Sequence, residues 1–222
     1  MSSHHIVREG QEPALIIANG SACTIELLNQ LLEWSPFIIV LDGALNRVLD
    51  LGIKFDVALG DFDGFNEDQI RDLIPPDTAI EHTPDQNKTD LEKGIEFLIA
   101  KGMEAVNIVW ATGKRSDHYL NNIGTIARYH KQIKMVMLDD YSRIYAIDSG
   151  FKKHKNKGDN FSLIPLNEVK NIKTTNLDWN LSNSDLNFPY STSSSNKVSN
   201  TDFVSISFDS GFLLAMECND LD

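Results

Sequence analysis

The chain has little of several features that would assign a protein to a class at once. It has only two cysteines, Cys23 and Cys218, in 222 residues. This excludes a disulfide-built scaffold and is typical of reduced, structural thiols in the cytoplasm. Basic residues are outnumbered by acidic ones, 20 against 32, and the formal net charge is −12. Because a non-specific nucleic-acid binder needs a basic surface, we expect no nucleic-acid partner.

Long apolar runs are also missing from the sequence. No stretch is long enough to span a bilayer, and the N-terminus lacks the basic-then-apolar pattern of a signal peptide. We therefore expect no membrane partner and a cytoplasmic location. The remaining composition, with 41% hydrophobic and 23% charged residues, is that of an ordinary globular protein. The length allows one large domain or two small ones.

In residues 1–142, short apolar runs alternate with segments of helical period. The runs predict buried strands at 14–18, 37–41, 57–59, 106–110 and 135–138, each followed by a polar loop and most by a helix. The clearest helix start is a capping box in which Thr89 accepts a backbone hydrogen bond and Glu92 reaches back. Asn66 and Gln69 form a weaker capping box before another helix. This alternation predicts a doubly wound, mostly parallel sheet with helices on both faces.

From residue 143 to 222 the helical period is lost. Short β-type runs follow at 143–147, 160–164, 169–174, 203–208 and 211–218, and Asp209-Ser210-Gly211 has the composition of a hairpin turn. We predict a second, all-β sandwich domain here. The Ser- and Asn-rich stretch 182–201 has the composition of a mobile loop, although we expect Val198–Thr201 to be ordered because it leads directly into a strand.

Two carboxylates follow the strand at 57–59. Asp61 and Asp63 occupy alternate positions, and in an extended backbone both would face one spot beyond the strand's carboxyl end. Open α/β sheets hold their ligands at that edge. Two like charges close together are commonly compensated by a hard divalent cation, which indicates a magnesium site built to hold phosphate. The alternative is a polar turn that happens to carry two Asp residues.

Three further loops after strands carry polar residues that could converge on the same edge. They are Asp42 to Asn46, Asp85 to Asp90, and Gly113 to His118. Asp90 lies in the first turn of its helix, where it either joins the carboxylate group or only stabilises the helix start. Lys114 and Arg115 precede another helix N-terminus, a combination that suits a phosphate but also describes an ordinary surface pair.

Taken together, these loops resemble the motifs of the thiamine pyrophosphokinase family. Its Asp-Gly-Gly-Ala-Asn, Gly-Asp-Phe-Asp-Ser, Asp-Gln-x-x-Thr-Asp-Leu and Gly-x-Arg-x-Asp-His motifs correspond, in order, to residues 42–46, 60–64, 85–91 and 113–118. Segments 174–181 and 198–201 are similar to the family's thiamine-side segments. Three departures stand out: Leu45 follows a single glycine and an alanine, Gly64 replaces Ser, and Asn176 replaces a glycine. Asn at 176 is tolerable if its backbone is left-handed.

The resemblance implies transfer of the β,γ-pyrophosphoryl group of ATP to the hydroxyl of thiamine, giving thiamine diphosphate and AMP. It assigns residues 1–142 as the catalytic ATP- and Mg²⁺-binding domain and residues 143–222 as the thiamine-binding domain. By similarity, Mg²⁺ would be held by Asp61, Asp63 and Asp90. ATP would be bound by Asp42, Asn46, Lys114, Arg115 and Asp117. Thiamine would be bound by Gln86, Thr89, Trp179, Ser199 and Asn200. The catalytic residues would be Asp63, Asp90 and Arg115.

The resemblance also implies a homodimer in which the active site is shared between subunits. Trp179 would then stack on the thiamine pyrimidine, a reasonable contact for a partly cationic heterocycle. The competing interpretation makes Trp179 a core residue of the sandwich. Asp117 is expected to anchor Arg115 or the second substrate rather than to act as a base.

Two other functions remain open from the sequence. Asp61-Phe62-Asp63 after an apolar strand resembles the haloacid-dehalogenase phosphatases, in which the first Asp is a nucleophile. That reading leaves the Thr89-Asp90 and Arg115-Asp117 loops without a role. A nucleotide- or thiamine-binding sensor without turnover is the second alternative, and the altered loop at 42–46 is the feature that favours it.

Overall fold

The computed structural model describes residues 13–63 and 67–219, and the chain divides into two compact units between Asp139 and Asp140. The division falls three residues before the predicted boundary, which lies inside the strand Ser142–Ile147. The two units are described separately below. Among the described residues, no helix has both the length and the apolar character needed to cross a membrane.

The N-terminal unit is built on a parallel sheet. Its strands are β1 (Ala14–Ile17), β2 (Ile38–Leu41), β3 (Val57–Gly60), β4 (Ala79–His82), β5 (Ala105–Val109) and β6 (Lys134–Leu138), in the order β4-β3-β2-β1-β5-β6. The register aligns Leu15 with Ile38 on one side and with Asn107 on the other. Residues of β1, β2, β3 and β5 are buried throughout, as expected for strands covered on both faces.

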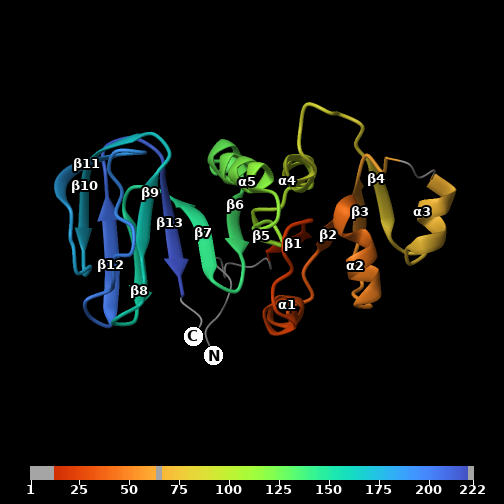
Figure 1. Cartoon of the computed structure of the whole chain (residues 1–222), viewed down its shortest axis with the longest axis horizontal. Coiled ribbons are helices and arrows are strands. Elements are labelled where there is room, and N and C mark those ends of the chain that lie inside the picture. The colour runs from red at the N-terminus through yellow and green to blue at the C-terminus, as the bar shows by residue number, and fades with distance from the viewer. Residues whose placement is uncertain (1–12, 64–66, 220–222) are drawn as a thin grey trace. The chain divides into compact units, whose positions relative to one another are not determined.

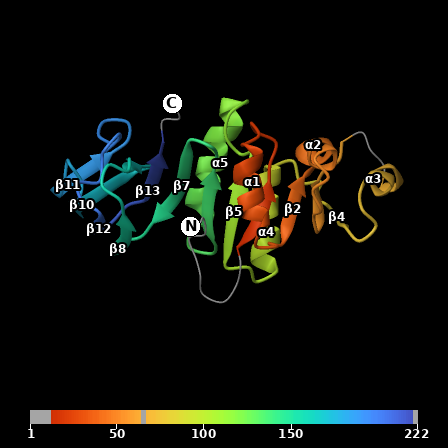
Figure 2. The ribbon, with the colours of Figure 1, turned by 90° about the horizontal axis from the view of Figure 1, so that it is seen from below.

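Helices connect these strands. They are α1 (Ile25–Leu32), the short 3₁₀ turn η1 (Asp42–Ala44), α2 (Leu45–Asp50), α3 (Glu67–Leu73), α4 (Asp90–Ala100) and α5 (Ser116–Tyr129). Within this unit, α4 and α5 lie on one side of the sheet and α1 on the other (Figures 1 and 2). The predicted doubly wound fold is confirmed. The capping box proposed at Asn66 lies outside the described residues.

Only one of the two hydrogen bonds of the predicted capping box at the start of α4 is formed. Thr89 Oγ1 accepts the Glu92 N–H at 3.4 Å, as predicted. Glu92 does not reach back to the helix start, because its Oε1 instead accepts hydrogen bonds from the Tyr129 hydroxyl at 2.9 Å and pairs with Arg128 Nη1 at 2.5 Å. This buried contact fastens α4 to α5, so Glu92 serves helix packing rather than capping.

The C-terminal unit consists of antiparallel strands in two sheets. One contains β7 (Ser142–Ile147), β13 (Leu213–Cys218) and β9 (Ser162–Pro165), in that order. The other contains β11 (Ser182–Asn187), β10 (Glu168–Thr175), β12 (Asp202–Ser207) and β8 (Phe151–Lys155), in that order. Buried Phe161, Leu163, Val169, Ile206 and Leu213 contribute to its core. The predicted all-β sandwich class is confirmed.

Two details of this unit differ from the prediction. Residues 209–211 do not form a hairpin, because β12 pairs with β8 and β10 whereas β13 pairs with β7 and β9. The connection therefore crosses from one sheet to the other. The Ser/Asn-rich stretch also contains a strand, β11, and is not a featureless loop. Cys23 and Cys218 form no disulfide.

Candidate active site

The N-terminal unit has a cleft of about 420 Å³ at the carboxyl ends of its strands. Strand order reverses at β1, since β2 to β4 extend to one side and β5 and β6 to the other. Ligands of open α/β sheets bind at such a reversal. The loops after β1, β2, β3 and β5 and the start of α4 all contribute to the walls. Seven predicted site residues line this cleft: Asp42, Asp61, Gln86, Thr89, Asp90, Lys114 and Arg115.

Asp42 is placed by the turn that ends β2. Its carboxylate accepts the backbone N–H groups of Gly43 and Phe62, so it links the ends of β2 and β3. Gly60 permits this approach, because a Cβ at that position would collide with the Asp42 carboxyl group. Burial raises the pKa of Asp42, and the negative charges of Asp90 and Asp61 raise it further. The cleft therefore gathers negative charge that the neighbouring N–H groups do not fully offset.

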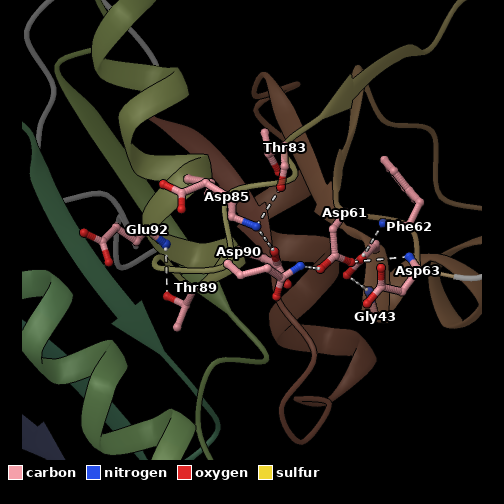
Figure 3. A network of polar contacts seen from close by, with 12 residues as sticks. Gly43, Asp61, Phe62, Asp63, Thr83, Asp85, Thr89, Asp90 and Glu92 are labelled. Atoms are coloured by element: carbon pink, nitrogen blue, oxygen red, sulfur yellow. Dashed lines mark hydrogen bonds and ion pairs between the residues drawn. The ribbon is translucent and has the colours of Figure 1, made fainter.

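Asp61 is oriented by the loop that precedes α4. Gln86 Nε2 donates to Asp61 Oδ2 at 2.9 Å. The Asp63 backbone N–H donates to Asp61 Oδ1 at 3.4 Å (Figure 3). These donors lower the pKa of Asp61, the Gln86 hydrogen bond being the main cause. Asp61 is thus held ionised and facing the cleft.

Asp90 begins α4 and is paired along the helix with Lys93. Lys93 Nζ donates to Asp90 Oδ1 at 3.2 Å and to the Thr83 carbonyl at 2.8 Å. Figure 3 labels the two acceptor residues, Asp90 and Thr83. The Lys93 side chain is only 6% exposed. Sequence reasoning overlooked this lysine, although its i,i+3 spacing from Asp90 places both on one helix face.

The predicted extended backbone from Asp61 to Asp63 is not present. Phe62 between them has φ of 50°, a left-handed conformation, and is buried. Asp61 lines the main cleft, whereas Asp63 lines a smaller hollow of about 300 Å³ together with Asn46. Asp42 and Asp61 border both spaces.

The predicted metal ligands are consequently not closely grouped. Within residues 13–63 and 67–219, no three His, Cys, Asp or Glu side chains are arranged to hold a metal ion. The chemistry nevertheless suits a divalent cation, because Asp42, Asp61 and Asp90 supply hard oxygen donors, and the charges of Asp90 and Asp61 add to burial in raising the pKa of Asp42. The assignment of Asp61, Asp63 and Asp90 as ligands stays a prediction.

The cationic side of the cleft is formed by the loop between β5 and α5. Arg115 Nε and Nη2 donate to the two carboxylate oxygens of Asp117 at 3.1 and 2.6 Å, so Asp117 anchors Arg115. Arg115 lowers the pKa of Asp117 to about 2. Lys114, with φ of 50°, donates from Nζ to the Asn19 carbonyl at 3.2 Å. Arg115 and Lys114 line the cleft, whereas Asp117, predicted to bind ATP, is not among its lining residues.

The predicted thiamine-side residues of the C-terminal unit lie near one another. An antiparallel bridge between Leu177 and Val198 joins their two segments. Ser199 Oγ donates to Asp178 Oδ1 at 2.7 Å, and the Asn200 N–H donates to Asn176 Oδ1 at 3.0 Å. The expectation that Val198–Thr201 is ordered is therefore confirmed.

Trp179 and Asn176 lie in the same region, and the structure tests one prediction for each. Trp179 is 65% exposed, which excludes the interpretation that it is a core residue of the sandwich. Asn176 has φ of 64°, so the left-handed backbone that would tolerate Asn in place of glycine is present.

Comparison with known proteins identifies the family. The catalytic-domain model of thiamin pyrophosphokinase matches residues 28–138, and the vitamin B1 binding domain model of the same enzyme matches residues 150–213. The chain belongs to the thiamin pyrophosphokinase family. Members of this family are ATP-dependent pyrophosphotransferases that use a divalent metal, and this supports the predicted kinase over the phosphatase and the sensor.

Individual relatives agree with the family assignment. The chain is 28% identical over 174 residues to thiamine pyrophosphokinase of Bacillus subtilis, covering 76% of this chain and 81% of the relative. It is 29% identical over 220 residues to thiamine pyrophosphokinase 1 of Arabidopsis thaliana, covering 85% and 80%.

Solved structures share the fold. The crystal structure of the Bacillus subtilis enzyme matches with a TM-score of 0.80 at 24% identity, covering 94% of this chain and all of that one. Thiamin pyrophosphokinase from Candida albicans matches with a TM-score of 0.79 at 15% identity, covering 94% and 90%.

Proposed function

We propose that this chain transfers the β,γ-pyrophosphoryl group of ATP to the hydroxyl of thiamine at the cleft of its N-terminal unit, yielding thiamine diphosphate and AMP. The observation that carries this proposal is the placement of charge. Carboxylates from the ends of β2 and β3 and from the start of α4 meet cations from the loop after β5 at the strand-order reversal. A polyphosphate with its cation needs both signs of charge in one cleft.

On the cationic side, Arg115 would offer its planar guanidinium to phosphoryl oxygens and Lys114 would add a less directional charge. Asp117 keeps Arg115 oriented through two hydrogen bonds. Asp42 in η1 and Asn46 in α2 would border the nucleotide just beyond the end of β2. These assignments rest on position in the fold and on the family motifs.

On the acidic side, Asp61, Asp63 and Asp90 would hold Mg²⁺, with Asp63, Asp90 and Arg115 as the residues closest to the chemistry. Mg²⁺ bound there offsets negative charge on the transferring phosphoryl oxygens. Gln86 orients Asp61 through its amide, and Lys93 neutralises part of the Asp90 charge. The protein's own task is to hold these groups in position before the reaction begins.

For thiamine, Gln86 and Thr89 would contribute from the N-terminal unit, and Trp179, Ser199 and Asn200 from the C-terminal unit. Trp179 presents an exposed indole suited to stacking. We propose that residues 1–142 act as the catalytic domain and 143–222 as the thiamine-binding domain of a cytoplasmic homodimer that shares its active sites between subunits.

The proposal is tested by incubating the protein with ATP, Mg²⁺ and thiamine and measuring AMP. AMP formed only when thiamine is present is the expected result. Free phosphate in place of AMP would favour a phosphatase, and binding without either product would favour a sensor. Substituting Ca²⁺ for Mg²⁺ tests the metal, because Ca²⁺ binds oxygen ligands with a different geometry.

The shared site is tested by mixing inactive Asp63→Asn subunits with inactive Asn200→Ala subunits. A heterodimer would carry one site free of both changes, so some activity should return. Parents that exchange subunits without recovering activity would contradict the shared site.

A further inference from the structure

Arg47 on α2 contacts the loops on both sides of the strand-order reversal, although it does not line the cleft. Its Nη2 donates to Asn19 Oδ1 at 3.1 Å and to the Gly20 carbonyl at 3.1 Å, both directly after β1. Its Cζ lies 4.4 Å from the ring centroid of Trp110, directly after β5. One guanidinium therefore joins the ends of the two strands between which a ligand would sit.

The backbone at this junction is tightly constrained. Trp110 has φ of 56°, an unfavourable conformation for a bulky residue. The Gly20 N–H donates to the Trp110 carbonyl, and a Cβ at Gly20 would collide with the carbonyl oxygens of Trp110 and Thr112. Such a conformation persists only where the surroundings over-determine it, and the Arg47 contacts are part of those surroundings.

The junction continues into the cationic side of the cleft. Asn19 accepts Arg47 on its side-chain oxygen and accepts Lys114 Nζ on its backbone carbonyl, at 3.2 Å. Asn19, Gly20, Trp110 and Lys114 all line the cleft. A chain of direct contacts thus runs from Arg47 through Asn19 to the ammonium group that the proposed function assigns to ATP.

We infer that Arg47 is a positioning residue for the ATP side of the site: it fixes Asn19 and Trp110 and, through Asn19, the place of Lys114. This inference rests on the proposed function, because it concerns affinity for ATP at this cleft. Arginine suits the role for a geometric reason. Its planar fork donates to two acceptors while its face stacks on an indole, whereas lysine offers a compact charge that does not reproduce both contacts.

The central experiment compares the wild type with Arg47→Lys, which keeps the charge and loses the fork. Binding of Mg-ADP is measured by calorimetry without thiamine, and both KM values are measured in the AMP assay. We expect the Kd for ADP and the KM for ATP to rise about tenfold, with the thiamine KM unchanged and kcat within about threefold. Arg71→Lys is the matched control, since Arg71 on α3 also donates to a carbonyl, that of Thr78 at 2.7 Å, outside the cleft.

A double-mutant cycle tests whether Arg47 acts through Lys114. If it does, the double variant Arg47→Lys with Lys114→Ala should bind ADP about as weakly as Lys114→Ala alone, because the second change has no positioned ammonium left to disturb. A purely structural role would instead give additive losses, or would raise the KM of ATP and thiamine together. Either of these results overturns the inference.

Failure of the inference and failure of the proposed function give different results. If the wild type forms no AMP and does not bind ADP, the proposed function fails. If Lys114→Ala binds ADP normally, the role assigned to Lys114 fails, and the inference about Arg47 fails with it. If Lys114→Ala binds weakly and Arg47→Lys binds like the wild type, only the positioning role fails. Should Arg47→Lys not fold by circular dichroism, Asn19→Ala removes an Arg47 acceptor and must show the same selective rise in the KM for ATP.

Discussion

The two units each contain a cluster of charged groups, and the clusters are balanced in opposite ways. In the cleft of the N-terminal unit, Asp42 lies near Asp90 and Asp61, and its pKa is raised by burial and by these like charges. In the C-terminal unit, buried Glu217 is surrounded by cations. Lys153 Nζ lies 2.5 Å from Glu217 Oε1 and Lys155 Nζ lies 3.0 Å from Glu217 Oε2.

The outcome for the carboxyl pKa differs accordingly. Burial alone would raise the pKa of Glu217, but Lys153 and Lys155 outweigh it and lower the pKa to about 2. The Tyr145 hydroxyl completes the cluster by donating to Glu217 Oε1 at 2.5 Å. A cluster that is complete within the protein supports the fold, whereas one left with excess charge is suited to a ligand.

The largest effect on turnover is expected from Asp90→Asn, which removes one negative charge from the cleft of the N-terminal unit. We expect turnover to fall by about 10³-fold or more, since the proposed metal site loses a charge at constant volume. Thermal stability should change little, because relief of the repulsion with Asp42 is offset by loss of the ion pair with Lys93, which keeps its hydrogen bond to the Thr83 carbonyl. AMP formation and a thermal melt measure the two effects. Near-normal turnover would remove Asp90 from the active site.

Glu217→Gln should show the reverse behaviour. Removing the carboxylate leaves the half-buried Lys153 without its counter-charge and leaves Lys155 with Asp159 alone, at a cost of about 3 kcal/mol in unfolding free energy. ADP binding to folded protein should not change. The control is Glu168→Gln, whose ion pair with Lys170 is exposed to solvent and is expected to contribute little to stability.

The effect of Glu217→Gln on stability should also depend on pH. The folded-state pKa of Glu217, about 2, lies below the ordinary value of 4.5. Its stabilising contribution is therefore complete above pH 4.5 and is lost as the pH falls toward 2. Urea unfolding of wild type and Glu217→Gln should give curves that converge between these values. A stability gap of constant size across this range would contradict the ion-pair explanation.

Trp179→Ala removes an exposed apolar side chain of the C-terminal unit that does not belong to the Glu217 cluster. Because Trp179 is 65% exposed, its loss should change the melting temperature little. Thiamine affinity should fall by about 10- to 100-fold, the range of about 1–3 kcal/mol for lost base stacking. ADP affinity should be retained. A large drop in melting temperature with an unchanged thiamine KM would contradict the assignment.

The smallest effect is expected from Thr89→Ala, which tests whether Thr89 only caps its helix or also contributes to thiamine binding. Thr89→Ala and Thr24→Ala each remove a side-chain cap, those of α4 and α1, and each should cost about 1 kcal/mol in stability. Thr89 also lines the cleft. Thr89→Ala should therefore raise the thiamine KM as well, while Thr24→Ala should leave both KM values unchanged.

The sequence predicted the buried elements well and the sheet edges poorly. The missed strands β4, β8 and β11 all lie at an edge of their sheet within their own unit. Their segments, Ala79–His82, Phe151–Lys155 and Ser182–Asn187, are largely polar or partly exposed. An edge strand forms hydrogen bonds on one side and buries less surface, so it carries little hydrophobic pattern.

For the site, motifs predicted which loops converge but not the contacts between them. These contacts depend on the backbone conformation of single residues. The left-handed conformation of Phe62, for example, separates the surroundings of Asp63 from the main cleft. Asn19, Arg47 and Trp110 gave no separate signal, because their roles arise from contacts between segments far apart in the chain. Such contacts depend on three-dimensional packing that local patterns do not encode.

The strand order also determines when the cleft comes into existence during synthesis. β1 pairs with β2 early, but its other edge waits for β5, whose residue Val106 aligns with Ala14. Until that segment leaves the ribosome, a fully apolar strand keeps one row of backbone groups unpaired. A nascent chain shorter than this would have neither the complete cleft nor both neighbours of β1, and would be open to misassociation and to chaperone binding.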